Sequence, residues 1–135
     1  MAFLLDTNVV SEVRKPRPQP AVLRWFEAAS AADLYLSVLV VGEIEQGVSR
    51  LRARDPQQAA AHGRWLARLR RDFADRLLDI DEDVALEWGR LNAREPRAVV
   101  DGLLAATALV HGLTLVTRNV RDFRGRGVPL LDPFV

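Results

Sequence analysis

The chain has 135 residues, of which 49% are hydrophobic, and its formal net charge is +1. This length and hydrophobic content suffice for one hydrophobic core and predict a single domain over residues 1–135. It contains no cysteine, which excludes disulfides, thiolate nucleophiles and cysteine-bound zinc and favours a cytoplasmic protein. No apolar stretch approaches the roughly 18 residues of a membrane span, and the N-terminal apolar run stops at Asp6, unlike a signal peptide.

The N-terminal half of the chain predicts short strands that alternate with helices. Residues 2–5 and 34–38 are short apolar runs ending at polar residues, which is typical of buried strands. Helices are expected over residues 7–13, from 20 to about 29, and from 37 or 38 onward. The last of these carries an apolar stripe at helical spacing, made of Val41, Ile44, Val48 and Leu51.

The C-terminal half continues the alternation. Its expected elements are helices over 57–76, 81–94 and 100–111 and strands over 113–117 and 128–131, the last at an edge of the sheet. Gly112 is expected to end the third helix. Short strands alternating with helices predict an α/β three-layer domain, in which helices flank both faces of a short, mostly parallel sheet.

Several acidic and amide side chains follow the predicted strands, at the carboxyl ends where functional groups gather in parallel sheets. Asp6 directly follows the first strand, and Asn119 and Asp122 follow a later one. Asp101 lies in the first turn of its helix, in the row that must face the core, so its carboxylate is expected to point inward. Glu43 lies beside the apolar stripe of its helix, and helical spacing alone does not fix where it points.

Carboxylates that converge on one rim of a sheet repel each other unless a cation neutralises them. Oxygen donors suit Mg²⁺ or Mn²⁺ rather than zinc, and such ions support in-line displacement at a phosphodiester. Simpler interpretations remain open. Asp6 and Asp101 also fit helix caps, Glu43 fits a solvated helix position, and Asn119 and Asp122 fit turns.

Four segments, in order along the chain, resemble the motifs of the PIN-domain family, most closely its VapC-like and FitB-like toxins. They are LLDTNVVSE at residues 4–12, VGEIEQG at 41–47, DGLLAATA at 101–108 and LVTRNVRDF at 115–123. Residues 131–134 are similar to the usual tail of the family. Each match is modest alone, but four in the right order are specific.

The resemblance implies a catalytic, metal-binding set made of Asp6, Glu43, Asp101 and Asn119. Asn119 stands where many members have aspartate, which weakens the case for a second tightly held metal. Asp122 is in the same loop and is expected to share that role as a metal ligand. Thr7 and Thr117 match positions whose hydroxyls support metal-bound water.

The resemblance further implies the toxin of a toxin–antitoxin pair, a Mg²⁺- or Mn²⁺-dependent endoribonuclease that forms homodimers and is silenced by a cognate antitoxin. Two groups of basic residues follow strand ends on the acidic rim, where an RNA backbone needs positive charge. The RNA-binding residues expected there are Arg14, Lys15, Arg118 and Arg121. Other features are interpreted as structural: His62 and His111, the tryptophans at 25, 65 and 88, and the solvated arginine-rich face of residues 64–76.

Other functions are weighed against this one. A phosphatase of the haloacid dehalogenase type expects a second aspartate two residues after Asp6, where Asn8 stands. A receiver-type module needs an acidic pair before the first strand and a late lysine, and the sequence has neither. Two alternatives keep the fold: an RNA-processing nuclease that is not a toxin, and a catalytically weak partner-binding protein, which Asn119 alone favours.

Overall fold

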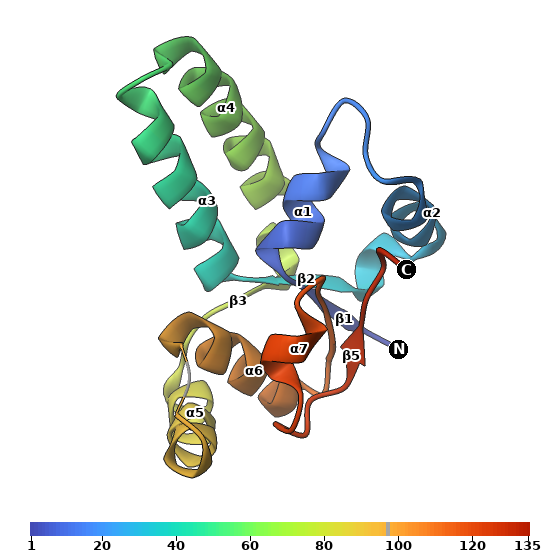
Figure 1. Cartoon of the computed structure of the whole chain (residues 1–135), viewed down its shortest axis with the longest axis vertical. Helices are drawn as coiled ribbons and strands as arrows, with labels where there is room; N and C mark the ends of the chain where they lie inside the picture. Colours follow the sequence, from blue (N-terminus) through green and yellow to red (C-terminus); the bar gives the residue numbers. More distant parts are fainter. Residues whose placement is uncertain (97) are drawn as a thin grey trace.

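The computed structural model describes residues 1–96 and 98–135, and Figure 1 shows a sheet with helices on both sides. The strands are β1 (Phe3–Leu5), β2 (Leu34–Ser37), β3 (Leu77–Leu78), β4 (Thr114–Val116) and β5 (Leu130–Leu131). The α-helices are α1 (Thr7–Val13), α2 (Pro20–Ala28), α3 (Val38–Arg52), α4 (Pro56–Asp72), α5 (Glu82–Arg94), α6 (Val99–His111) and α7 (Val120–Phe123). Single 3₁₀ turns are formed by Ala31–Asp33 and Ala74–Arg76.

The five strands form one parallel sheet in the order β3-β2-β1-β4-β5. β1 is central, with Leu4 opposite Tyr35 of β2 and Leu115 of β4. The prediction of a mostly parallel sheet is confirmed, as is the edge position of the last strand. Because the strands are parallel, their carboxyl ends open on one rim, and Asp6 and Thr117 directly follow two adjacent strands there.

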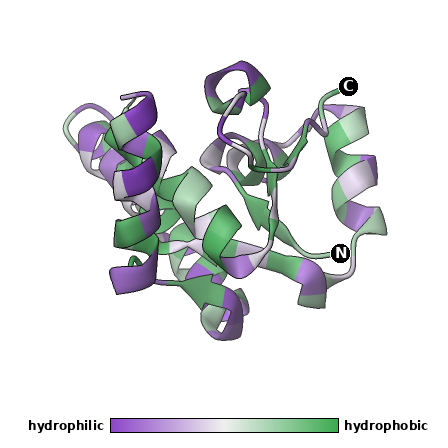
Figure 2. Ribbon diagram, turned by 90° about the horizontal axis from the view of Figure 1, so that it is seen from below, coloured by the Kyte–Doolittle hydropathy of each residue, from purple (hydrophilic) through white to green (hydrophobic). Residues whose placement is uncertain are grey.

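Alternate residues of the central strand serve two separate cores. Leu5 belongs to a cluster with residues of α1 to α4, whereas Leu4 belongs to a cluster with residues of α6 and α7. Successive side chains of a strand point to opposite faces, so both faces of the sheet are covered and the three-layer prediction is confirmed. Figure 2 shows the hydrophobic colour along the strands. Within the described part of the chain, no helix is long and apolar enough to cross a membrane.

The predicted helix over residues 57–76 ends too late. α4 stops at Asp72, and the chain turns through Ala74–Arg76 into β3, a strand that the sequence pattern did not predict. Phe73 is buried against the α1–α4 core, and the Arg76 guanidinium donates a 2.8 Å hydrogen bond from Nε to the carbonyl of Leu34. These long-range contacts carry the chain to the edge of the sheet, so tertiary packing overrides the local helical pattern.

The C-terminal elements follow the prediction closely, with one addition. α6 ends at Gly112, whose φ of 66° lies in the left-handed region that glycine adopts at little cost. A turn was the simpler interpretation of Asn119 and Asp122, and the segment forms the single helical turn α7, which begins directly after Asn119 and is anchored by the buried Phe123. α7 therefore fixes this segment beside the carboxyl end of β4.

Candidate metal-binding and nuclease site

Three hydrogen bonds hold Asp6 at the carboxyl end of the central strand. Its backbone N–H donates to the carbonyl of Val116 in β4, and its Oδ1 accepts a 2.7 Å bond from the N–H of Thr7. Asp6 is thus the N-cap of α1, so the simpler cap interpretation is correct for this residue. Its other oxygen, Oδ2, accepts a 2.8 Å bond from the hydroxyl of Thr117. Asp6 is 8% exposed, and its carboxylate is fixed from both sides.

Asn8 connects the two strand ends, and sequence reasoning assigned it no role in the site. Its amide nitrogen lies 3.4 Å from Asp6 Oδ2 and 3.5 Å from the Thr117 hydroxyl, and its Oδ1 accepts a bond from the N–H of Arg118. The Thr117 hydroxyl also accepts a 3.0 Å bond from the N–H of Asn119. The network locks the start of α1 to the start of α7. The signal available in the sequence was the Asp-x-Asn spacing directly after a strand.

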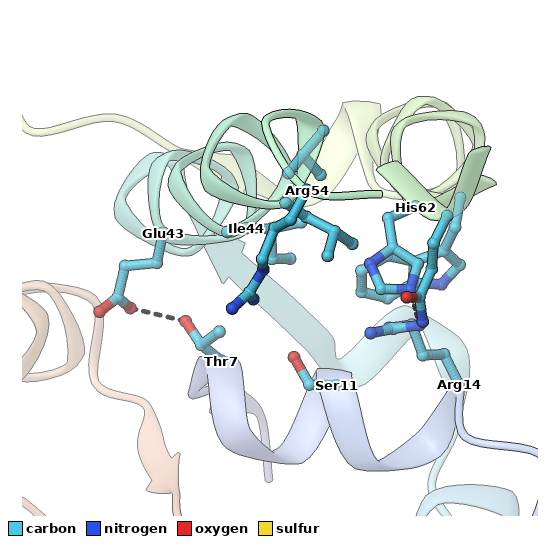
Figure 3. Close-up of a pocket in the computed structure, with 12 residues that line it drawn as sticks. Thr7, Ser11, Arg14, Glu43, Ile44, Arg54 and His62 are labelled. Carbon is cyan, nitrogen blue, oxygen red and sulfur yellow. Dashed lines mark hydrogen bonds between the residues drawn. The ribbon is translucent and has the colours of Figure 1, made fainter. Parts of the chain in front are cut away.

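Glu43 lies one turn inside α3 and is exposed. Its Oε1 accepts a 2.6 Å hydrogen bond from the hydroxyl of Thr7, as Figure 3 shows. Helical spacing could not fix where this side chain points, and the structure directs it towards the start of α1. Thr7 and Thr117, expected to support bound water, are thus occupied in holding Glu43 and Asp6.

Asp101 lies in the first turn of α6 and is half-buried, in the helical row of the buried Leu104, Ala105 and Ala108. The inward position expected from the sequence is therefore observed. Burial raises the pKa of Asp101 above its ordinary value, the charges of Asp122 and Glu43 raise it further, and that of Arg126 lowers it.

The charges of several acids act on one another across this rim. Burial is the largest cause of the raised pKa of Asp6, hydrogen bonds from Thr117 and Thr7 lower it, and the charges of Glu43 and Asp101 raise it again. Within residues 1–96 and 98–135, no three acidic or histidine side chains are yet arranged to hold one ion. Glu43 is exposed and hydrogen-bonded to Thr7, and in this arrangement it does not complete a three-acid cluster with Asp6 and Asp101. The donor set is otherwise all oxygen and carries excess negative charge, which fits a hard divalent cation.

The four basic residues predicted to bind RNA lie in different surroundings. Lys15 pairs with Glu12 at 2.9 Å, which neutralises much of its charge. Arg14 lies over the ring of Trp65, and Arg118 lies over the ring of Phe134. Arg118 and Arg121 line a hollow of about 360 Å³ together with Asn119 and Asp122. Arg118 and Arg121 therefore border the rim that carries the acids, whereas Arg14 lies at the other end of α1 from Asp6.

Comparison with known proteins agrees with this architecture. Residues 3–127 match the PIN domain family. The chain is 34% identical over 137 residues to the Toxin FitB of Neisseria gonorrhoeae, with 98% of each chain covered. It is 32% identical over 137 residues to the VapC ribonuclease Y4jK of Sinorhizobium fredii, covering 98% of this chain and 97% of that one. The crystal structure of FitAcB from Neisseria gonorrhoeae superposes with a TM-score of 0.87 at 34% identity, over 98% of both chains.

The chain therefore belongs to the PIN-domain family. Within that family it is a toxin of the FitB and VapC type, because the similarity to those toxins extends over nearly its whole length.

Proposed function

We propose that this protein is the toxin of a toxin–antitoxin pair and acts in the cytoplasm as a Mg²⁺- or Mn²⁺-dependent endoribonuclease. The single observation that carries the proposal is that Thr7 joins two of the acids at the carboxyl end of the central strand, its N–H donating to Asp6 Oδ1 and its hydroxyl to Glu43 Oε1. Repelling carboxylates are costly to keep together, and a divalent cation offsets that cost. The ribonuclease name of the VapC relative supports RNA as the substrate.

The site residues have distinct roles in this proposal. Asp6, Glu43 and Asp101 would hold the cation, and Asn119 and Asp122 would complete the set from α7. When bound there, such an ion would neutralise charge on the phosphate and activate water for in-line displacement of the leaving oxygen. Thr117 keeps the Asp6 carboxylate in one orientation, and Thr7 keeps Glu43 at the edge of the site.

Positive charge beside the acids supports binding of a polyanion. Arg118 and Arg121, on one side, and Arg14 and Lys15, on the other, would contact the RNA backbone. The structures of FitAcB and of FitAB bound to DNA support a small antitoxin as the partner of this chain. We further propose that residues 1–135 act as one domain and pair as a homodimer, as the toxin resemblance implies.

The test is cleavage of RNA by the purified chain with Mg²⁺, with Mn²⁺, and with a chelator. Cleavage is expected with either ion and not with the chelator. Asp6→Asn, Glu43→Gln and Asp101→Asn should each abolish it and keep the wild-type circular dichroism spectrum. Glu27→Gln, which neutralises an exposed glutamate of α2, is the matched control and should cleave as wild type does. Cleavage that persists in chelator, or full activity of Asp6→Asn, would falsify the proposal.

A further inference from the structure

A groove leads away from the acidic rim between α1 and the pair of helices α3 and α4 (Figure 3). It encloses about 440 Å³, with Thr7 and Glu43 at one end and His62 and Trp65 at the other. Its wall along α3 runs from Glu43 to Leu51, which is about 12 Å at the helical rise of 1.5 Å per residue. A groove of that length is longer than a single phosphate group and can hold a short stretch of an extended polymer chain.

Two arginines project into this groove. Arg14 reaches it from the end of α1, and Arg54 reaches into it from the turn between α3 and α4, between the two ends of the groove (Figure 3). Among the described residues that line the groove, Glu43 is the one acidic side chain, and neither arginine forms an ion pair within the described part of the chain. The groove away from Glu43 is therefore positively charged, and its two guanidinium groups keep their full charge for an anion.

Neutral side chains hold Arg14 in place. Its guanidinium lies 5.0 Å from the centre of the Trp65 ring, and its Nη1 lies 3.1 Å from His62 Nε2. A guanidinium can only donate, so His62 Nε2 must accept and the neutral ring carries its proton on Nδ1. The pKa of His62 is lowered, first by burial and then by the charge of Arg14, while the charge of Asp55 acts in the opposite direction, and the lowered pKa favours the neutral ring at pH 7. His62, interpreted from the sequence as structural, thus orients a cation without neutralising it.

We propose that this groove is a subsite for the RNA strand beside the cleaved bond, in which Arg14 and Arg54 bind the neighbouring backbone phosphates. The inference rests on the proposed ribonuclease function, because that function places one RNA phosphate at the Glu43 end of the same groove. The adjoining phosphates must then leave along the surface, and this cation-lined passage opens directly there. Trp65 and His62 are positioning residues for Arg14.

The first experiment measures binding of short single-stranded RNA homopolymers, one of uridine and one of adenosine, to the full chain carrying Asp6→Asn. Adding Arg14→Gln or Arg54→Gln should each weaken binding about tenfold, the usual size of one lost charged hydrogen bond. The loss should be equal for both homopolymers, because phosphate contacts carry no base information. Each variant should also reduce the slope of log affinity against log salt by roughly 0.7. Arg68→Gln, on the exposed face of α4, is the control and should change none of these.

A second arm blocks the groove without removing charge. Gly47 lines the groove, and a Cβ added there meets no atom within 4 Å, so Gly47→Leu should fold and fill the passage. Gly89, in α5, has the same open surroundings outside the groove and supplies the matched control, Gly89→Leu. Only Gly47→Leu should lose the gain in kcat/KM that wild type shows when a dinucleotide substrate is lengthened. For the positioning role, His62→Phe should weaken RNA binding, and His62→Gln, which keeps an acceptor, should restore it.

The outcomes separate this inference from the function on which it rests. A wild-type chain that neither binds nor cleaves RNA overturns both. A chain that cleaves RNA, with Arg14→Gln, Arg54→Gln and Gly47→Leu all at wild-type affinity and salt slope, overturns the subsite alone. Variants that bind RNA normally but no longer form a complex with the co-expressed antitoxin would show that the groove receives a protein, which also overturns the subsite.

Discussion

Thr117 donates a 2.8 Å hydrogen bond to Asp6 Oδ2, joining two residues 111 positions apart at the carboxyl ends of adjacent parallel strands. Both residues are buried, so the carboxylate depends on this hydroxyl in place of water. Thr117→Val keeps the shape and removes the donor. It should lower the free energy of unfolding by about 1–2 kcal/mol, the cost of leaving a buried acceptor short of a partner.

Chemical denaturation in chelator measures the effect of Thr117→Val, with Thr107→Val as the matched control. Thr107 is equally buried, but its hydroxyl donates to the Leu103 carbonyl within the same helix, so its loss should cost less. Equal stability of the two variants would show that the Thr117 bond contributes nothing to holding Asp6.

Asp101→Asn should melt a few degrees higher than wild type at pH 7 in chelator. The pKa of Asp101 is raised in the folded chain, so its ionised form is destabilising there. A carboxyl whose pKa is raised in the folded state stabilises the fold at pH values below its unfolded pKa. That contribution is lost as the pH rises through the folded-state pKa. The gain is about 1 kcal/mol at most, because solvent screens a half-exposed carboxylate.

Mg²⁺ should raise the melting temperature of wild type and have much less effect on Asp101→Asn, because an ion stabilises the state that binds it. Glu27→Gln serves as the control for loss of an acid outside the site. A lower melting temperature for Asp101→Asn in chelator, together with no response of wild type to Mg²⁺, would contradict the metal site.

Asn119→Asp should tighten Mn²⁺ and Mg²⁺ binding, because a carboxylate adds a full charge where the amide offers one neutral oxygen. Titration calorimetry measures this change, and Gln57→Glu, which adds one charge at an exposed position of α4, is the control.

Asp122→Ala should lower the rate of cleavage, since Asp122 already acts on the charge of Asp101. Wild-type kinetics for Asp122→Ala would leave it as a residue of α7 with no part in the site.

Glu12 should make the fold sensitive to acid. Lys15, first, and the backbone N–H of Gln19 lower the pKa of this carboxyl below its ordinary value of 4.5. A carboxyl whose pKa is lowered in the folded state stabilises the fold at pH values above its unfolded pKa. That contribution is lost as the pH falls through the folded-state pKa. Glu12→Gln should therefore melt below wild type at pH 7, and the gap should close as the pH falls below 4.5. Thermal melts over this range test it, and a gap that is independent of pH would contradict it.

Much of the fold and the positions of Asp6 and Asp101 could be predicted from the sequence, because the signals are local. A short apolar run followed by Asp6 marks a strand end and a helix start within a few residues. The apolar row of α6 places Asp101 on the side of the core, and Gly112 marks the end of that helix. Hydrophobic periodicity fixes the face of a helix or strand on which a side chain lies, and these positions could be predicted without knowledge of any long-range contact.

Which other elements those helix and strand faces pack against was decided only by the tertiary structure. α4 ends and β3 pairs with β2 where Arg76 binds the carbonyl of Leu34, and no local pattern encodes that contact. Glu43 has no preferred direction from helical spacing until Thr7 lies beside it. Arg14 and His62 are 48 residues apart, and their pairing follows from the docking of α4 against α1. Spacing along a helix fixes an angle about its own axis, whereas a site requires the positions of several axes relative to one another, which packing alone determines.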